Sequence, residues 1–370
     1  MTAVRRCRQD MGGGLAMRVV VITTIALAAI CPAARADRYS REVLFSLDYG
    51  SGPRQLGISV PEPDEEAEKG PPRGPTDVAV GRNGGVYMAD EVNRRVLGFD
   101  QYGNLIMVTK ERVDSPQLIA ADSKGNVYML EASGPDFLSK FGPDGARLWG
   151  IALPALIPVG LHGPASPVFW ELSVGSDDTL CVGFDQGAGL AVAVLNGDGA
   201  LVSTHQAYAR TPANRFVSLE NLGEEKLASA IRIVGADGAT TASYTADVGS
   251  SCTLSIMAGA VDFTRRFFDV EDGCYNLLHA VRAQRVPLRA NLDLALDVIV
   301  TRHDRTGRLT AYLRVPASPF PSGLGITVDP QGNVYHLAYG PSSVTVVRYR
   351  LHKSEEVGET WELAPEAAGK

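Results

Sequence analysis

The sequence GPTDVAVGRNGGVYMADEVNRRVLGFDQYGNLI, which runs from Gly74 to Ile106, contains short apolar segments separated by turn residues. Related phrases are SPQLIAADSKGNVYMLEASGPDFLSKFGPDGARL from Ser115 and PSGLGITVDPQGNVYHLAYGPSSVTVVRYRL from Pro321. Each copy contains an apolar strand, a glycine-containing turn, a second strand that opens with Val-Tyr, and a third strand. The chain is therefore predicted to consist of repeated antiparallel units that stack or close into a ring.

The first copy resembles a blade of the NHL-repeat β-propellers. A blade of that family has Gly-(Asn/Asp)-Val-Tyr at its second strand, Ala-Asp at the end of that strand, Asn-x-Arg-Val at the third strand and a Phe-Asp-x-x-Gly hairpin. The matching residues here are Val86, Tyr87, Ala89, Asp90, Asn93, Arg95, Val96, Phe99, Asp100 and Gly103. The resemblance implies that Asp90 bonds to Asn93 or Arg95 within its blade.

The resemblance covers part of the chain. It is strong over residues 41–57, 74–149 and 321–351 and weak between them. The second copy departs from the pattern, because Glu131 stands where the first copy has Asp90.

The spacing of the second strands predicts six blades. Their first apolar residues are Val86, Val127, Leu180, Leu227, Cys274 and Val334, at intervals of 41 to 60 residues, near the roughly 40 to 50 residues of a four-stranded propeller blade. A seventh blade stays open between residues 212 and 262, where GADGATT could turn between either of two strand pairs. With 45% hydrophobic residues, 39 glycines and no long amphipathic helix, the expected fold class is an all-β propeller. A plain β-sandwich or β-solenoid is the alternative.

The two ends of the ring are expected to meet. The last copy supplies three strands, and the segment REVLFSLDYGSGPRQLG from Arg41 resembles the end-of-blade phrase of the family. Residues 43–48 are therefore predicted to be the outer strand of the last blade, in a single propeller domain of residues 37–352. Residues 353–370 are expected to be an acidic, flexible tail.

The N-terminus is predicted to be a signal peptide of residues 1–36. Arg18 precedes the apolar run VVVITTIALAAIC, and a small-residue cleavage pattern ends at Ala36. The run is too short to anchor the protein in a bilayer. Whether translation starts at Met1 or Met17, we expect cleavage after Ala36 and export to the periplasm or the extracellular space, with no membrane insertion after cleavage.

Charge and cysteine content narrow the partner classes. Without the first 36 residues the chain has 30 basic and 41 acidic side chains, a formal net charge of about −11. This charge disfavours nucleic acid and anionic membranes as partners. The remaining cysteines, Cys181, Cys252 and Cys274, form neither an even set nor a zinc-type cluster. Cys181 is interpreted as a small hydrophobic core residue at the position that Tyr87 fills in the first blade.

Three insertions are expected on one face of the ring. They are the acidic stretch 61–74, the apolar stretch 151–167 and the basic stretch 282–291. The glycine turns are expected on the opposite face. Because binding residues concentrate on long loops held by a rigid scaffold, the face with the insertions is the predicted binding face.

Two groups of residues are binding candidates on that face. Guanidinium groups suit a carboxylate, phosphate or sulfate, and exposed apolar side chains suit a protein partner. The candidates are Arg282, Arg285, Arg289, Leu153, Leu156 and Ile157. The sequence therefore predicts a binding or scaffold protein for a protein, peptide or glycan ligand that carries negative charge, without a cofactor.

The alternative is an enzyme. Propellers of this type include metal-dependent lyases and lactonases with a metal in the central channel, so a divalent ion such as Ca²⁺ or Zn²⁺ is the alternative cofactor. Channel candidates are His279 and His336 on second strands and Asp77 and Glu171 at the starts of first strands. Neither a nucleophile elbow nor a phosphate-binding loop is present.

Overall fold

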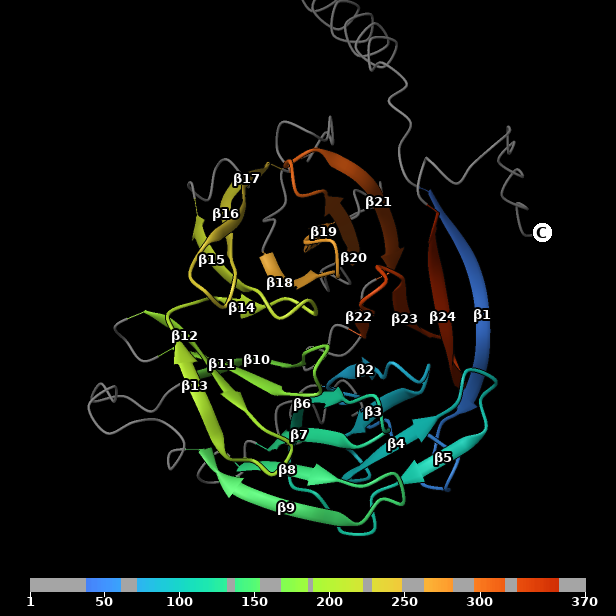
Figure 1. Ribbon diagram of the computed structural model, residues 1–370. Helices are drawn as coiled ribbons and strands as arrows, with labels where there is room; N and C mark the ends of the chain where they lie inside the picture. The colour runs from blue at the N-terminus through green and yellow to red at the C-terminus, as the bar shows by residue number, and fades with distance from the viewer. Residues whose placement is uncertain are drawn as a thin grey trace, which may run out of the picture. The chain divides into compact units, whose positions relative to one another are not determined.

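The computed structural model describes residues 38–60, 72–131, 137–153, 168–185, 189–221, 228–247, 263–281, 296–316 and 325–352. These residues form six four-stranded antiparallel sheets. Figure 1 shows the sheets around a common centre, with the first strand of each innermost. The predicted six-bladed β-propeller is confirmed. The predicted signal peptide and acidic tail lie outside the described residues.

In each of the first three blades, the four strands are consecutive in the chain and lie in the sheet in that same order. Blade 1 consists of β2 (Val78–Val80), β3 (Val86–Asp90), β4 (Arg95–Phe99) and β5 (Leu105–Val108). Blade 2 consists of β6 (Pro116–Ala121), β7 (Val127–Glu131), β8 (Phe137–Phe141) and β9 (Arg147–Ala152). Blade 3 consists of β10 (Val168–Val174), β11 (Leu180–Asp185), β12 (Leu190–Leu195) and β13 (Leu201–His205).

The last three blades include the one that contains both ends of the ring. Blade 4 consists of β14 (Ala209–Arg210), β15 (Phe216–Asn221), β16 (Ala228–Val234) and β17 (Thr240–Asp247). Blade 5 consists of β18 (Phe263–Phe268), β19 (Cys274–Val281), β20 (Leu296–His303) and β21 (Leu309–Pro316). Blade 6 consists of β22 (Ile326–Val328), β23 (Val334–Tyr339), β24 (Ser343–His352) and β1 (Arg38–Asp48).

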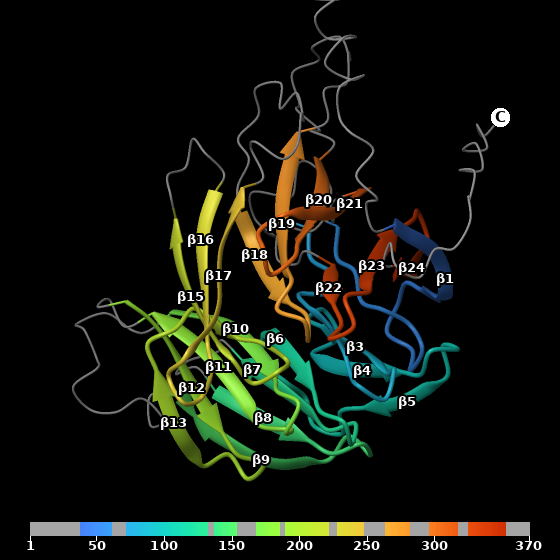
Figure 2. The same ribbon diagram turned by 45° about the horizontal axis from the view of Figure 1, so that its top comes forward.

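The ring is closed by the pairing of β1 with β24. The antiparallel ladder runs from Arg38 opposite His352 to Asp48 opposite Ser343, and the two strands lie side by side in Figures 1 and 2. The predicted outer strand at residues 43–48 is confirmed, and it begins earlier, at Arg38. Leu47 of β1 is 2% exposed and belongs to the core between blades 6 and 1. Closure therefore buries apolar surface as well as pairing a sheet edge.

One predicted strand start was wrong. Leu227 precedes the third strand of blade 4, and the second strand of that blade is β15, which begins at Phe216. The GADG turn at residues 235–238 joins the third and fourth strands. The turn before β15, residues 211–215, contains no glycine. Asn214 adopts the left-handed conformation at the position where most of the other turns have glycine, with φ 63°. The six blades include the described part of residues 212–262, where the sequence allowed a seventh blade.

The core lies between successive blades. The second residue of the second strand is Tyr87, Tyr128 or Tyr275 in blades 1, 2 and 5, and each is at most 1% exposed. Cys181 has the same position in blade 3 and is also 1% exposed. Burial raises the pKa of its thiol to about 11, so the thiol is protonated at neutral pH. Cys181 is a core residue, as predicted.

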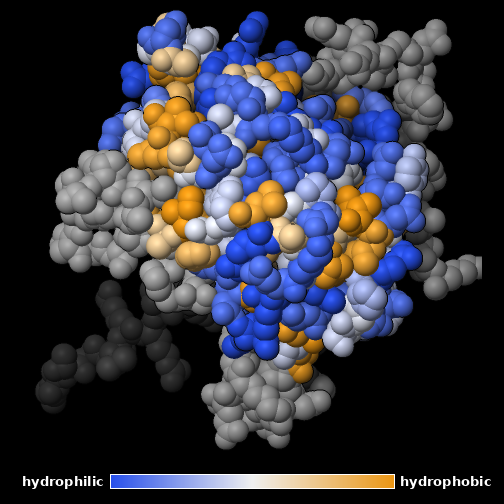
Figure 3. Space-filling model, turned by 60° about the horizontal axis from the view of Figure 1, so that its bottom comes forward, coloured by the Kyte–Doolittle hydropathy of each residue, from blue (hydrophilic) through white to orange (hydrophobic). Residues whose placement is uncertain are grey.

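Among the described residues, no helix is long and apolar enough to cross a membrane. The surface shown in Figure 3 is mostly hydrophilic, with hydrophobic side chains in separate patches. Exposed hydrophobic residues occur on several outer strands, for example Ile106 on β5, Val202 on β13 and Tyr312 on β21.

Candidate functional site

Two kinds of connection emerge at opposite edges of the sheets. Those between the first and second strands and between the third and fourth strands are all five residues long. The eleven turns are residues 81–85, 100–104, 122–126, 142–146, 175–179, 196–200, 211–215, 235–239, 269–273, 304–308 and 329–333. We call this edge of the propeller the turn face.

The same hydrogen bonds recur in all eleven turns. The first N–H donates to the fifth C=O, and the fourth N–H donates to the first C=O. The fourth residue always has a positive φ; it is glycine in eight turns, and in the others it is Asp178, Asn214 or Asp272. A type I turn followed by one left-handed residue matches the twist of the two flanking strands. Because an inserted residue would break both bonds, this geometry explains the constant length.

Connections at the other edge, which we call the loop face, vary from three to 29 residues. Four of them exceed ten residues, namely 49–77, 153–167, 248–262 and 282–295. Three of these contain the predicted insertions. The fourth, residues 248–262, was missed because the strands of blade 4 were misplaced. All the variation in connection length therefore belongs to one edge of the propeller.

All six predicted binding residues belong to these connections. Five lie outside the described residues, namely Arg282, Arg285, Arg289, Leu156 and Ile157. Leu153, which follows β9 directly, is 1% exposed and packs in a core cluster with Tyr128 and Leu172. Leu153 thus has a packing position between blades 2 and 3, and its side chain is not available to a partner.

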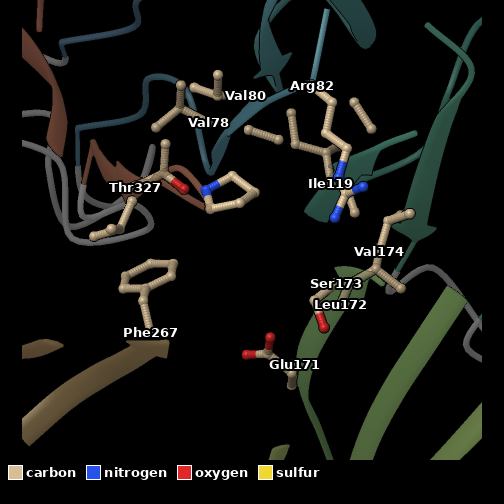
Figure 4. Close-up of a pocket in the computed structure, with 15 residues that line it drawn as sticks. Val78, Val80, Arg82, Ile119, Glu171, Leu172, Ser173, Val174, Phe267 and Thr327 are labelled. Atoms are coloured by element: carbon tan, nitrogen blue, oxygen red, sulfur yellow. The ribbon is translucent and has the colours of Figure 1, made fainter. Parts of the chain in front are cut away.

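The central channel contains a cavity of about 100 Å³ (Figure 4). The next-to-last residues of five of the six innermost strands line the cavity. They are Ala79, Ala120, Ser173, Thr327 and Phe267. Four of these side chains are small, so the blades leave a hollow around the axis. Phe267 supplies the one aromatic ring among the described lining residues.

The two acidic channel candidates have different positions. Glu171 is 7% exposed, lines the cavity and is directed into it across from Phe267 and Thr327 (Figure 4). Asp77 is 5% exposed, and its Oδ2 accepts a hydrogen bond from the N–H of Ile119 at 3.0 Å. Asp77 therefore joins the first strands of blades 1 and 2, which is a structural role.

His336 does not join these acids around a metal. His336 is not among the residues that line the cavity. It is 2% exposed, and its Nε2 lies 3.0 Å from the carbonyl oxygen of Pro316 in the neighbouring blade. Burial lowers the pKa of His336 to about 4, so the ring is neutral at pH 7. The position of the His279 side chain lies outside what the structure describes. Within the described residues, no three His, Cys, Asp or Glu side chains are grouped so that they could hold a metal ion.

Two lining residues were not singled out from the sequence. Arg82 is the second residue of the turn after β2, and Phe267 belongs to β18. A signal existed for Arg82, because it lies two residues after the end of a predicted innermost strand. Nothing in FTRRFF indicated which of its residues faces the axis.

No protein-family model matches the chain, and no protein of curated function matches it. Several solved structures resemble it in fold. One is hydrazine synthase of Kuenenia stuttgartiensis, with 13% identity, coverage of 70% of this chain and 72% of that one, and a TM-score of 0.43. Virginiamycin B lyase from Staphylococcus aureus has 11% identity, coverage of 84% and 99%, and a TM-score of 0.44. A member of the DUF4221 family from Bacteroides vulgatus has 9% identity, coverage of 85% and 99%, and a TM-score of 0.45. Such similarity assigns no function.

Proposed function

We propose that the protein is an exported binding or scaffold propeller of the NHL type, which recognises its ligand through the loop face. One observation carries this proposal. All eleven connections on the turn face have the same length, whereas those on the loop face range from three to 29 residues. Loops of varied length on a rigid scaffold are the usual carriers of recognition.

The NHL assignment is supported by the side chains of blade 1. Asp90 accepts hydrogen bonds from both Asn93 and Arg95, which is the arrangement that the sequence pattern implies. Arg95 also donates to the carbonyl groups of Gly52 and Gln55 in the segment that follows β1. The pattern residues therefore connect the closing segment to the first blade.

The composition of the connections suggests the ligand class. Residues 282–295 contain Arg282, Arg285 and Arg289, three guanidinium groups in a chain whose net charge after residue 36 is about −11. Guanidinium groups bind carboxylates, phosphates and sulfates through paired hydrogen bonds. An acidic protein segment, peptide or glycan fits this chemistry. Leu156 and Ile157 belong to a different long connection and supply apolar side chains for a protein ligand. The proposal needs no cofactor.

Export is part of the proposal. It is supported by the apolar run after Arg18 and the cleavage pattern that ends at Ala36. Cleavage after Ala36 would leave the whole of β1, which begins at Arg38, on the mature chain. N-terminal sequencing of the exported protein tests the cleavage position.

A binding assay with charge variants tests the loop face. We would immobilise the protein and measure its binding to an array of acidic peptides and uronic-acid oligosaccharides. Replacing Arg282, Arg285 and Arg289 together by Ser should reduce binding at least tenfold. The matched control is Arg305→Ser with Arg308→Ser, because both residues are exposed and belong to a turn-face connection.

The control variant should bind as the unchanged protein does. Equal binding by the triple variant and the unchanged protein would contradict the anionic-ligand proposal. Loss of binding in the control variant alone would assign recognition to the turn face instead.

A further inference from the structure

The channel cavity extends to the turn face, opposite the edge of the proposed function. Its lining includes Val174 and Val328, the last residues of β10 and β22, and Arg82 and Pro330 in the turns that follow first strands. Glu171 lies three residues before the end of β10, roughly 10 Å along an extended strand. The cavity therefore has an outer end at the turns and an inner end near Glu171.

Arg82 places a guanidinium group at the outer end. Its Nη1 donates to the carbonyl oxygen of Ser176 at 3.1 Å, so the side chain reaches from a turn of blade 1 to a turn of blade 3. Arg82 is exposed, and among the described residues no carboxylate pairs with it. Since a guanidinium has five N–H donors, most of its donors remain for a ligand. Figure 4 shows this guanidinium directed toward the cavity.

Behind Arg82 the wall is apolar. Val80, Val174, Val328 and Pro330 surround the outer part, and Phe267 lies further in. The cavity of about 100 Å³ exceeds the roughly 10–15 Å³ that one water molecule needs in the same measure. A short aliphatic chain of three or four carbon atoms therefore fits this space.

The apolar wall sets the selectivity of the cavity. A second negative charge placed beyond Arg82 would lose its hydration next to Val174, Val328 and Phe267. The cavity thus has a positive group at its outer end and an apolar part behind it. This order selects against dicarboxylates.

We propose that the turn-face mouth of the channel binds a short-chain aliphatic monocarboxylate. The carboxylate of the ligand pairs with Arg82, and its hydrocarbon chain occupies the space between Val174, Val328 and Phe267. This site is separate from the loop face, so it stands or falls independently of the proposed function.

A ligand-observed NMR titration of the purified protein with butyrate tests this site. We expect saturable binding of butyrate and at least tenfold weaker binding of succinate, which has a second carboxylate. Arg82→Gln should weaken butyrate binding at least tenfold. Ser173→Leu, which retains Arg82 but fills the hollow, should weaken it to a similar extent.

The matched control is Arg308→Gln, which removes an exposed positive charge from another turn on the same face. This variant should bind butyrate within twofold of the unchanged protein. Absence of saturable binding, equal binding by Arg82→Gln, or equal affinity for succinate would overturn the proposal. Equal losses in Arg82→Gln and Arg308→Gln would also overturn it, because they would indicate diffuse attraction to the face.

Discussion

The carboxylate of Asp90 accepts a hydrogen bond from Nε of Arg95 at 2.9 Å, and both residues hold the closing segment of the ring. The other carboxylate oxygen of Asp90 accepts from the N–H of Gly57 at 3.0 Å. Nη2 of Arg95 donates to the carbonyl oxygens of Gly52 at 2.8 Å and Gln55 at 2.7 Å. One buried ion pair in blade 1 thus fastens the chain that runs on from the outer strand of blade 6.

Removing this carboxylate should destabilise the propeller. Asp90 is fully buried and the Arg95 side chain is 13% exposed, so Asp90→Ala leaves an uncompensated buried charge and several unpaired donors. We expect a loss on the order of 3 kcal/mol in the free energy of unfolding, measured by urea denaturation. Lys110→Ala is the control, because it breaks an exposed ion pair with Asp144 and should lower the free energy of unfolding far less than Asp90→Ala does. Similar losses in the two variants would contradict the structural role of Asp90.

Truncation of the chain tests the ring closure. A protein that starts at Gly52 lacks all of β1, so it leaves the β24 edge unpaired and exposes the core around Leu47. We expect aggregation or a large fall in melting temperature. Removal of residues 356–370, which lie beyond β24, should change the melting temperature little. Equal melting temperatures for the N-terminal truncation and the full chain would show that closure does not stabilise the fold.

The turn geometry predicts which glycines are required. A Cβ atom on Gly145, with φ 78°, would lie 1.8 Å from the carbonyl oxygen of Val108 in the neighbouring blade. Gly145→Ala should therefore destabilise the protein by on the order of 2–4 kcal/mol. At Gly84 the φ angle is 79° but no atom lies within 4 Å of such a Cβ, so Gly84→Ala should cost only about 1 kcal/mol. Denaturation midpoints in the reverse order would contradict this account of the turns.

Asp272 should make stability depend on pH. Burial raises the pKa of this carboxyl to about 6, against the opposing effect of Arg215; Nη1 of Arg215 lies 2.9 Å from its Oδ2. Asp269 also raises the pKa, and Arg305 lowers it. Since the folded-state pKa exceeds the unfolded value of 3.8, the stabilisation by protonation is complete below 3.8 and is lost as the pH rises through about 6.

The measurement compares unfolding free energies at pH 5 and pH 7.5. Between pH 7.5 and pH 5, the free energy of unfolding of the unchanged protein should rise by about 1 kcal/mol more than that of Asp272→Asn. Asn is a suitable replacement because it tolerates the left-handed conformation that Asp272 adopts, with φ 66°. An identical pH dependence of the two proteins would show that Asp272 does not bind a proton in this range.

Local signals in the sequence predict most of the ring. Blades 1, 2 and 6 have a glycine at the left-handed position of the turn before their Val-Tyr strands, and their second strands were found correctly. Blades 3 and 5 have Asp178 and Asp272 at that position, but their turns contain Gly175 and Gly273, and their second strands were also found correctly. Blade 4 has Asn214 at that position and no glycine in the turn. Asparagine tolerates left-handed φ but also occurs widely elsewhere, so the turn at residues 211–215 could not be recognised and Leu227 was taken as a strand start.

The sequence predicts the channel less well, because residues distant along the chain meet there. Asp77 and Glu171 both lie three residues before the last residue of a first strand, yet one bonds to blade 2 and the other faces the cavity. His336 belongs to a second strand, and its side chain packs between blades. Periodicity indicates which residues of a strand point to opposite sides of the sheet. Which blade or cavity each side faces is determined only when the ring closes.

Amide hydrogen exchange with a bound acidic ligand tests the central claim, recognition through the loop face, most directly. The ligand would be the peptide or uronic-acid oligosaccharide that binds best in the array, added at saturating concentration. We predict slower exchange in the loop-face connections, especially residues 282–295 and 153–167, and unchanged exchange in all eleven five-residue turns. Slower exchange confined to the turns, or none in the loop-face connections, would contradict recognition through the loop face.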